Sequence, residues 1–465
     1  MPLAKLLKGL LIAVGLAFAA VIGIYVLLLV VNLHDEPASG LVKSLQAETA
    51  RETPVADKEN AWVYVMGFNT ARHEAPDDAG ALRAAWMRQS LRSIEALDTD
   101  KDPGAETPAL FPAAGPDSEL LNACSRSDTD CLLAINASPA AWGELLAKNR
   151  WIIQRYEALL EHGAWQEASP YDVLAPLPPL ADVFNAQKLY CLQAISAAFP
   201  SSGISEIFAR DARFWMMVSL HSDTLLTRMI ATKALERNLR FLNLVARSHV
   251  DIQAETVRPG IWKMPLTPSY FSMRHVLKGE WRFADRLSWQ MKAGDEGLQL
   301  TDDWGDRDWT SYSLSFLQRP LLQPQYSSNQ QAELLMQLAN ILDASQENYA
   351  DVMAEAKALE SAKLKQMYAP RLYNIALPMA PHDREPQFYS YGARVLDIEG
   401  IRRGVIAIID LRQAGTRPAN IGTALAAHPL ITSYKNGRYH WDAEHGVLVF
   451  QGMAEDAKKT YELVY

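Results

Sequence analysis

Aromatic and acidic residues gather in the stretch between residues 262 and 309. Sugar-binding enzymes stack aromatic rings on the apolar faces of a saccharide, and a pair of carboxyl groups performs the acid–base chemistry. Tryptophan also fills the core of large helical domains, and we favour that interpretation here. The candidates for a saccharide cleft are Glu280, Trp281, Trp289, Asp303, Trp304 and Trp309.

Two further clusters combine residue types that bind metals. TDDWGDRDW at residues 301–309 is acidic, but it lacks the alternating acids and the final glutamate of a calcium-binding EF-hand loop. HWDAEH at residues 440–445 spans the end of an expected strand and a turn, so its side chains should diverge. The chain also contains no P-loop, G-x-G-x-x-G, H-E-x-x-H or G-x-S-x-G motif. The sequence therefore assigns no catalytic, cofactor-binding or metal-binding residue.

The chain has three cysteines, and two of them lie close together. Cys124 and Cys131 have neither the C-x-x-C spacing of a redox pair nor nearby partners for zinc. In an oxidising compartment such a pair persists as a disulfide. We therefore predict a Cys124–Cys131 disulfide, and a buried free thiol at Cys191 on the apolar face of a helix.

An uncharged apolar run covers residues 9–31. As a helix it would be about 35 Å long, enough to cross a hydrocarbon core of about 30 Å. Secretory signal peptides have shorter apolar regions and a small-residue cleavage site, so we expect a retained anchor. Lys5 and Lys8 precede the run, whereas Asp35 and Glu36 follow it. This asymmetry predicts a cytoplasmic N-terminus and a periplasmic domain on the bacterial inner membrane.

The formal net charge of −9 bears on the choice of partners. Nucleic-acid binding depends on clustered lysine and arginine, so this charge argues against it. It argues equally against electrostatic adsorption to anionic lipid. The expected partner is the lipid bilayer, through residues 9–31, and a protein of the cell envelope is a candidate second partner.

The elements that must position these residues are mostly helical. We expect a cytoplasmic stub at 1–8, a polar stalk at 35–58, a helical domain at 59–427 and a small β-meander at 428–465. Within the domain, apolar periodicity predicts helices at 203–249 with a bend near His221, at 328–343, at 346–366 and at 389–413. Asn436–Gly437 and a second turn at 442–446 are typical of hairpins. The fold class is therefore mainly α, with a terminal meander.

Several stretches resemble a group of single-pass, envelope-facing proteobacterial membrane proteins of unknown function. They are ENAWVYVMGF, CSRSDTDCLLAI, NRWIIQRYEALL, HSDTLLTRMIATKALERNLRFL, MYAPRLYNIALP and YGARVLDIEGIRRGVIAIIDLR. The resemblance implies an inner-membrane protein and transfers no active-site residue.

These observations favour a binding or structural component of the envelope over an enzyme. The first alternative is a hydrolase or lyase that acts on peptidoglycan or another envelope polysaccharide through residues 262–309. The second is an accessory subunit of a secretion or pilus assembly, in which the membrane helix contacts the partner.

Overall fold

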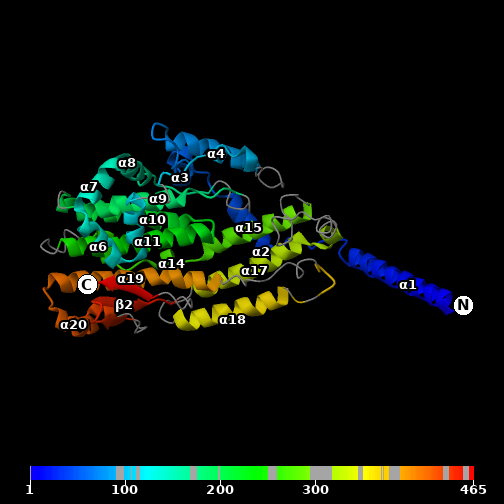
Figure 1. The fold of residues 1–465 in the computed structure, drawn as a ribbon. Coiled ribbons are helices and arrows are strands. Elements are labelled where there is room, and N and C mark those ends of the chain that lie inside the picture. The colour runs from blue at the N-terminus through cyan, green and yellow to red at the C-terminus, as the bar shows by residue number, and fades with distance from the viewer. Residues whose placement is uncertain are drawn as a thin grey trace.

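The computed structural model is predominantly α-helical and ends in a three-stranded antiparallel sheet (Figure 1), so the predicted fold class is confirmed. The structure describes residues 2–90, 99–105, 107–111, 116–167, 175–196, 199–249, 259–293, 317–343, 349–367, 369, 371–375, 388–432, 439–453 and 460–465.

The elements follow one another as a long helical array. The α-helices up to residue 248 are α1 (Pro2–Val31), α2 (Gly40–Ala50), α3 (Ala61–Met66), α4 (Pro76–Ser90), α5 (Pro116–Arg126), α6 (Asp128–Ala137), α7 (Pro139–Lys148), α8 (Arg150–Leu159), α9 (Leu180–Leu192), α10 (Ser201–His221) and α11 (Leu225–Ser248). The later α-helices are α13 (Gly260–Lys263), α14 (Pro268–Phe271), α15 (Arg274–Ala293), α17 (Pro324–Leu342), α18 (Tyr349–Met367), α19 (Phe388–Gln413), α20 (Ile421–Ala427) and α21 (Pro429–Thr432). Short 3-10 turns lie at Asp57–Glu59, Thr99–Lys101, Gln193–Ile195, Arg319–Leu321 and Pro418–Asn420.

The centre of the body is built on α10, α11 and α19, with α11 packed between the other two. The predicted bend near His221 is confirmed, because α10 ends there and α11 begins at Leu225. The N-cap of α11 is Thr224, whose hydroxyl accepts a hydrogen bond from the Thr227 N–H at 3.3 Å. The apolar residues of α19 occur around its whole circumference, which is typical of a helix buried on all sides.

The C-terminal sheet consists of β1 (Tyr439–Asp442), β2 (Val447–Gln451) and β3 (Thr460–Val464) in that order. It packs on α19, where Gly400 and Gly404 leave room for it. A Cβ atom on Gly400 would lie only 2.1 Å from the Phe450 ring, so only glycine permits this approach. The turn at 442–446 is confirmed, whereas Asn436–Gly437 lies outside the described residues. Residues Pro429–Thr432 form α21, so the meander gains its third strand after β2 and not before β1.

The segment 35–58 is not a polar stalk. Residues Gly40–Ala50 form α2, and the Ser39 hydroxyl caps this helix by accepting a hydrogen bond from the Val42 N–H at 3.1 Å. Val42 and Leu45 are fully buried, and α2 packs against α17. Two buried side chains are too few to produce a periodic pattern in a short polar helix, which explains the wrong prediction.

The structure confirms the predicted disulfide between Cys124 of α5 and Cys131 of α6. Closing so short a loop should stabilise the fold by about 2–3 kcal/mol. Cys191 is a free thiol that is completely buried in α9. Burial raises the pKa of this thiol well above its ordinary value, so it is unreactive at neutral pH.

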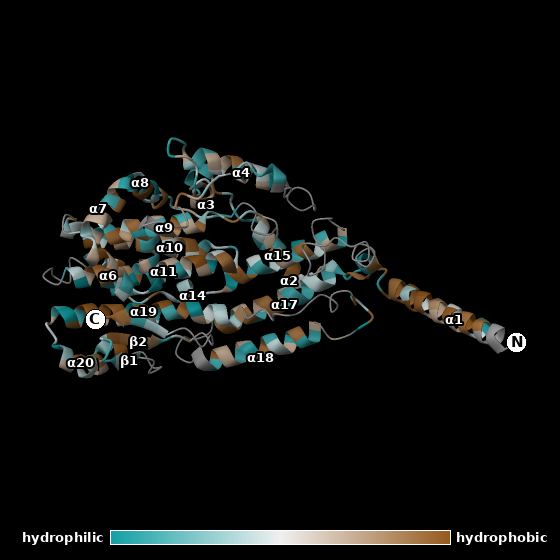
Figure 2. Cartoon of the chain, viewed as in Figure 1, coloured by the Kyte–Doolittle hydropathy of each residue, from teal (hydrophilic) through white to brown (hydrophobic). Residues whose placement is uncertain are grey.

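Helix α1 extends away from the body and is apolar along most of its length (Figures 1 and 2). In the described part of the chain, its segment Leu7–Val31 is the one helix long and apolar enough to cross a membrane. No residue of its most apolar part is buried inside the protein. Its composition therefore fits a membrane anchor or a signal sequence, but not a core helix.

The last turns of α1 nevertheless contact the body. Tyr25, Leu28 and Leu29 pack against Leu321 and Leu322, which form a small apolar cluster separate from the main core. The Tyr25 hydroxyl also donates a hydrogen bond to the Leu317 carbonyl at 3.0 Å. The helix is thus attached to the domain by its own side chains as well as by the chain that follows it.

A buried polar cluster continues this junction beyond the helix end. The side chain of Asn32 donates to the Leu372 carbonyl at 2.8 Å and accepts from the Asn374 N–H at 2.7 Å. The Gln323 side chain donates to the Asn32 carbonyl at 2.7 Å. All three residues are buried: Asn32 is 4% exposed, Gln323 2% and Asn374 0%. Since buried polar groups need partners, each of these three residues depends on the others.

Asp35 then fixes the direction of the chain as it enters the domain. Its carboxylate accepts hydrogen bonds from the N–H groups of Gln325 and Tyr326, at 2.7 and 3.0 Å. These residues belong to the first turn of α17, where a negative charge is stabilised by free N–H groups and by the helix dipole. The junction between α1 and the domain is therefore specific and not a flexible tether.

Candidate functional site

The described residues of the proposed saccharide cleft do not form one groove. Trp281 is 2% exposed, and its Nε1 donates to the Ser328 hydroxyl at 3.0 Å. Trp289, on the same helix, is 36% exposed. Asp303, Trp304 and Trp309 lie outside the described residues. The core interpretation therefore holds for Trp281, whereas Trp289 is only partly covered.

Glu280 is the one described cleft candidate that borders a sizeable cavity. This cavity has a volume of about 690 Å³ and lies among α3, α4, α10, α11, α15, α19 and the segment 175–180. Its wall is mostly apolar. The aromatic side chains in the wall are Trp62, Trp165, Trp215, Phe283, Phe388 and Tyr391.

Two carboxyl groups meet the cavity at the N-terminus of α11. Glu167 accepts hydrogen bonds from the Asp223 N–H at 3.2 Å and from the Thr224 hydroxyl at 3.4 Å. Glu280 accepts a hydrogen bond from the Leu225 N–H at 2.6 Å. These donors surround the start of α11, where N–H groups lack partners within the helix. Both glutamates thus stabilise the N-terminus of α11, although one precedes this helix in the sequence and the other follows it.

Close packing of α15 brings Glu280 to this position. A Cβ atom on Gly279 would lie 1.6 Å from the Asp223 carbonyl oxygen, so any other residue would push the helix away from the α10–α11 turn. Because Gly279 permits this approach, the carboxylate of the next residue reaches the first turn of α11. The position of Glu280 therefore depends on Gly279.

The surroundings of the two carboxyl groups favour their neutral forms. Burial, with a smaller effect from the nearby Asp223 charge, raises the pKa of Glu167 to about 8. Burial also raises the pKa of Glu280, although the hydrogen bond from Leu225 opposes this shift. Glu167 is therefore largely protonated at neutral pH.

Sequence reasoning missed Glu167. It follows Trp165 in a short connection after α8, in a stretch with no period and no motif. Its partners Asp223 and Thr224, at the start of α11, are distant in the sequence. No local signal could have revealed the pairing.

A second set of buried polar side chains lies around Asp211. Its carboxylate, 0% exposed, accepts hydrogen bonds from Tyr156, Gln187 and Asn238 at 2.5, 2.9 and 2.8 Å. Burial raises the pKa of Asp211 to about 6, against the opposing effect of these hydrogen bonds. Because the donors come from α8, α9 and α11, the network joins these helices to α10 and is structural.

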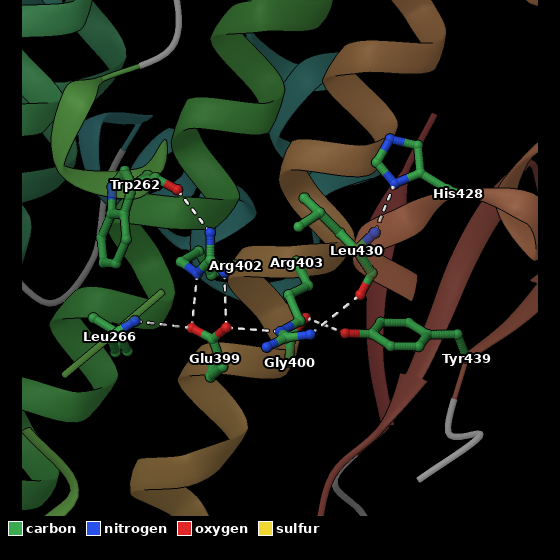
Figure 3. Close-up of polar contacts among 9 residues, drawn as sticks. All are labelled: Trp262, Leu266, Glu399, Gly400, Arg402, Arg403, His428, Leu430 and Tyr439. Carbon is green, nitrogen blue, oxygen red and sulfur yellow. Dashed lines mark hydrogen bonds and ion pairs between the residues drawn. The ribbon is translucent and has the colours of Figure 1, made fainter. Parts of the chain in front are cut away.

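A third polar cluster lies on α19 (Figure 3). Glu399 accepts two hydrogen bonds from Arg402 and one from Arg403, all at 2.7 Å. Arg402 also donates to the Trp262 carbonyl at 2.8 Å, and the Tyr439 hydroxyl donates to the Gly400 carbonyl at 2.6 Å. The cluster thereby links α19 to α13 on one side and to β1 on the other.

The histidine and acids of residues 440–445 do not converge. His445 pairs with Asp442 at 2.7 Å in an exposed turn. Among the described residues, no three His, Cys, Asp or Glu side chains come together as a metal ion would require. The other acidic cluster, residues 301–309, lies outside the described part of the chain.

Of the groups above, the cavity at the start of α11 is the candidate functional site, because the other two polar clusters are closed structural networks. Apolar and aromatic walls of this kind bind an apolar molecule by excluding it from water. The two carboxyl groups and the Arg394 side chain supply the polar edge. Comparison of the chain with known protein families, with characterised proteins and with solved structures finds no significant match, so the resemblance noted from the sequence stays a prediction.

Proposed function

We propose that this chain is a membrane-anchored binding protein of the bacterial envelope, whose periplasmic helical domain holds an apolar ligand in the cavity at the start of α11. The observation that carries the proposal is the cavity itself. Its volume of about 690 Å³ lies within the range of about 300–1,000 Å³ typical of small-molecule sites.

The carboxyl groups support binding better than saccharide hydrolysis. A glycosidase needs one carboxyl group to donate a proton to the substrate and another to act on the sugar ring. Here Glu167 and Glu280 both accept hydrogen bonds from the start of α11. Sugars also require many polar partners, whereas most of this wall is apolar.

The junction of α1 with the body supports a retained anchor. Cleavage after α1 would remove Tyr25, Leu28 and Leu29, and would expose Leu321 and Leu322 to water. A signal sequence has no reason to make such contacts with the mature domain. Lys5 and Lys8 before the span support a domain outside the cytoplasm.

Filling the cavity tests the binding function. Ile230 is a half-buried cavity residue, and Ile230→Trp places a large ring in the space a ligand would occupy. We expect the purified protein to bind the apolar fluorophore N-phenyl-1-naphthylamine saturably, and the variant to bind it at least about tenfold more weakly, a loss of about 1.4 kcal/mol. Fluorescence titration measures both affinities.

Ile341→Trp is the matched control, because Ile341 is a half-buried residue of α17 that does not line the cavity. This variant should bind the fluorophore as the unmodified protein does, and circular dichroism should show both variants folded. Absence of saturable binding, or equal binding by folded Ile230→Trp, would contradict the proposal.

The anchor has its own test in cells. A phosphatase reporter fused after Tyr465 should be active, because the domain is expected in the periplasm, where that enzyme folds. The fusion should also remain in the membrane fraction after washing with alkaline carbonate. Recovery of a soluble protein lacking the first residues would show that α1 is a cleaved signal.

A further inference from the structure

Exposed leucines surround the point where α1 meets the domain. Leu33, Leu317 and Leu372 are 69%, 46% and 54% exposed. They lie next to the helix end, because the Leu317 carbonyl accepts the Tyr25 hydroxyl bond and the Leu372 carbonyl accepts the Asn32 bond. We call these three residues the leucine rim.

The apolar span is longer than a bilayer requires. Leu7–Val31 contains 25 residues, and at 1.5 Å per residue it measures about 37 Å, against a hydrocarbon core of about 30 Å. The part of the helix before Tyr25 measures only about 27 Å. The turns from Tyr25 onward, which the domain contacts, are therefore needed for the helix to reach fully across the hydrocarbon.

This overlap places the base of the domain at the membrane surface. If the turns containing Tyr25, Leu28 and Leu29 lie at the outer boundary of the hydrocarbon, then the residues packed on them lie there as well. A tyrosine at this depth matches the preference of aromatic side chains for the membrane–water interface. The exposed side chains of the leucine rim would then face the apolar part of the bilayer and not water.

The polar groups at the base suit this position. Lys292 donates hydrogen bonds to the Leu322 carbonyl at 2.6 Å and to the Pro320 carbonyl at 3.3 Å, which satisfies backbone groups of the loop beside α1. Asp35 is bound to the start of α17 and so does not repel the headgroups as a free charge would. The negative charge of the whole chain opposes adsorption by charge alone, but this contact is apolar and continuous with the span.

We propose that the leucine rim is inserted into the interfacial layer of the bilayer that α1 spans, so that the domain rests on the membrane in a fixed orientation. The inference depends on the anchor proposed above and goes beyond it. A tethered domain without this contact would move freely above the surface.

Depth-dependent quenching tests the inserted rim. Leu317→Cys and Leu372→Cys, each labelled with the environment-sensitive fluorophore NBD, are reconstituted as the full chain into phosphatidylcholine–phosphatidylglycerol vesicles. Cys191 is buried and the other two cysteines form the disulfide, so the label reaches only the new thiol. We expect blue-shifted emission, and strong quenching by lipids that carry a nitroxide near the headgroup.

The matched control is Leu133→Cys on α6, an equally exposed leucine at 63% that lies in the body away from α1. Its label should emit as in water and show several-fold weaker quenching. Val21→Cys within the span should be quenched by lipids that carry a deep nitroxide. If the Val21 label is quenched and the rim labels behave like Leu133, the inserted rim is wrong while the anchor stands. If the Val21 label also remains in water, both proposals are wrong.

Discussion

Replacement of Glu399 by glutamine is expected to lower the free energy of unfolding by about 3–5 kcal/mol, the cost of removing one partner from a buried ion pair. The reason is Arg402, whose side chain is 1% exposed and shares two hydrogen bonds with the Glu399 carboxylate. A glutamine amide is uncharged and has a single acceptor oxygen, so Arg402 would keep its charge in the core without a counter-charge and with one hydrogen bond fewer. Arg403 is less affected, because its side chain is 18% exposed.

Chemical denaturation at pH 7 measures this effect. Glu355→Gln, at an exposed position on α18, is the control and should change stability by less than about 0.5 kcal/mol. The double variant Glu399→Leu with Arg402→Met should be milder than Glu399→Gln, because it leaves no unpaired charge at position 402. Equal stability of Glu399→Gln and the unmodified protein would show that the cluster does not hold α19 in place.

The same cluster has a defined pH dependence. Burial alone would raise the pKa of Glu399, but the hydrogen bonds and charges of Arg402 and Arg403 lower it below its ordinary value of 4.5. A lowered pKa in the folded state stabilises the protein above the unfolded value and loses its effect as the pH falls. The difference between Glu399→Gln and the unmodified protein should therefore shrink below about pH 4.5.

The sequence predicted the features that depend on neighbouring residues. An uncharged run of apolar residues is sufficient to identify α1, and two cysteines seven positions apart in a chain expected to be exported are sufficient to suggest the disulfide. The helix predicted at 389–413 is α19 (Phe388–Gln413), and the one predicted at 328–343 is α17 (Pro324–Leu342). Long apolar periodicity determines such helices largely by itself.

Features that depend on distant partners could not be predicted. The cavity is formed by side chains from at least six helices, and none of these helices carries a motif. Asn32 is a polar residue directly after an apolar run, so the sequence marks it only as the end of the membrane segment. Its partners Gln323 and Asn374 become visible only when the chain is folded. Trp281 and Trp289 lie in the same helix, and only the structure separates the partly exposed ring of Trp289 from the buried ring of Trp281.

Glu167 carries the second large expected effect, a change in how stability depends on pH. Its pKa is raised to about 8 in the folded protein, from 4.5 in the unfolded chain. Between these values the folded state holds a proton that the unfolded state has lost, so stability falls as the pH rises from about 4.5 to about 8 and then levels off. Glutamine resembles the protonated glutamate and cannot ionise. The stability of Glu167→Gln should therefore lack this decline.

We compare the free energy of unfolding of Glu167→Gln with that of the unmodified protein at each pH. Between pH 5 and pH 8.5 this difference should change in favour of the variant by on the order of 3 kcal/mol. Each unit of pKa shift corresponds to about 1.4 kcal/mol, and solvent reduces the total because this side chain is only half-buried. Other groups also titrate in this range, including Lys188, whose burial lowers its pKa to about 8. Comparison of the two proteins at each pH removes their contribution.

Urea denaturation at several values between pH 5 and pH 8.5 provides the measurement. Glu144→Gln, at an exposed position on α7, should follow the unmodified protein throughout. Parallel stability curves for Glu167→Gln and the unmodified protein would mean that Glu167 is ionised in the folded state at neutral pH. In that case the cavity wall would carry a negative charge beside α11 as well as the positive charge of Arg394, and a purely apolar ligand would be disfavoured.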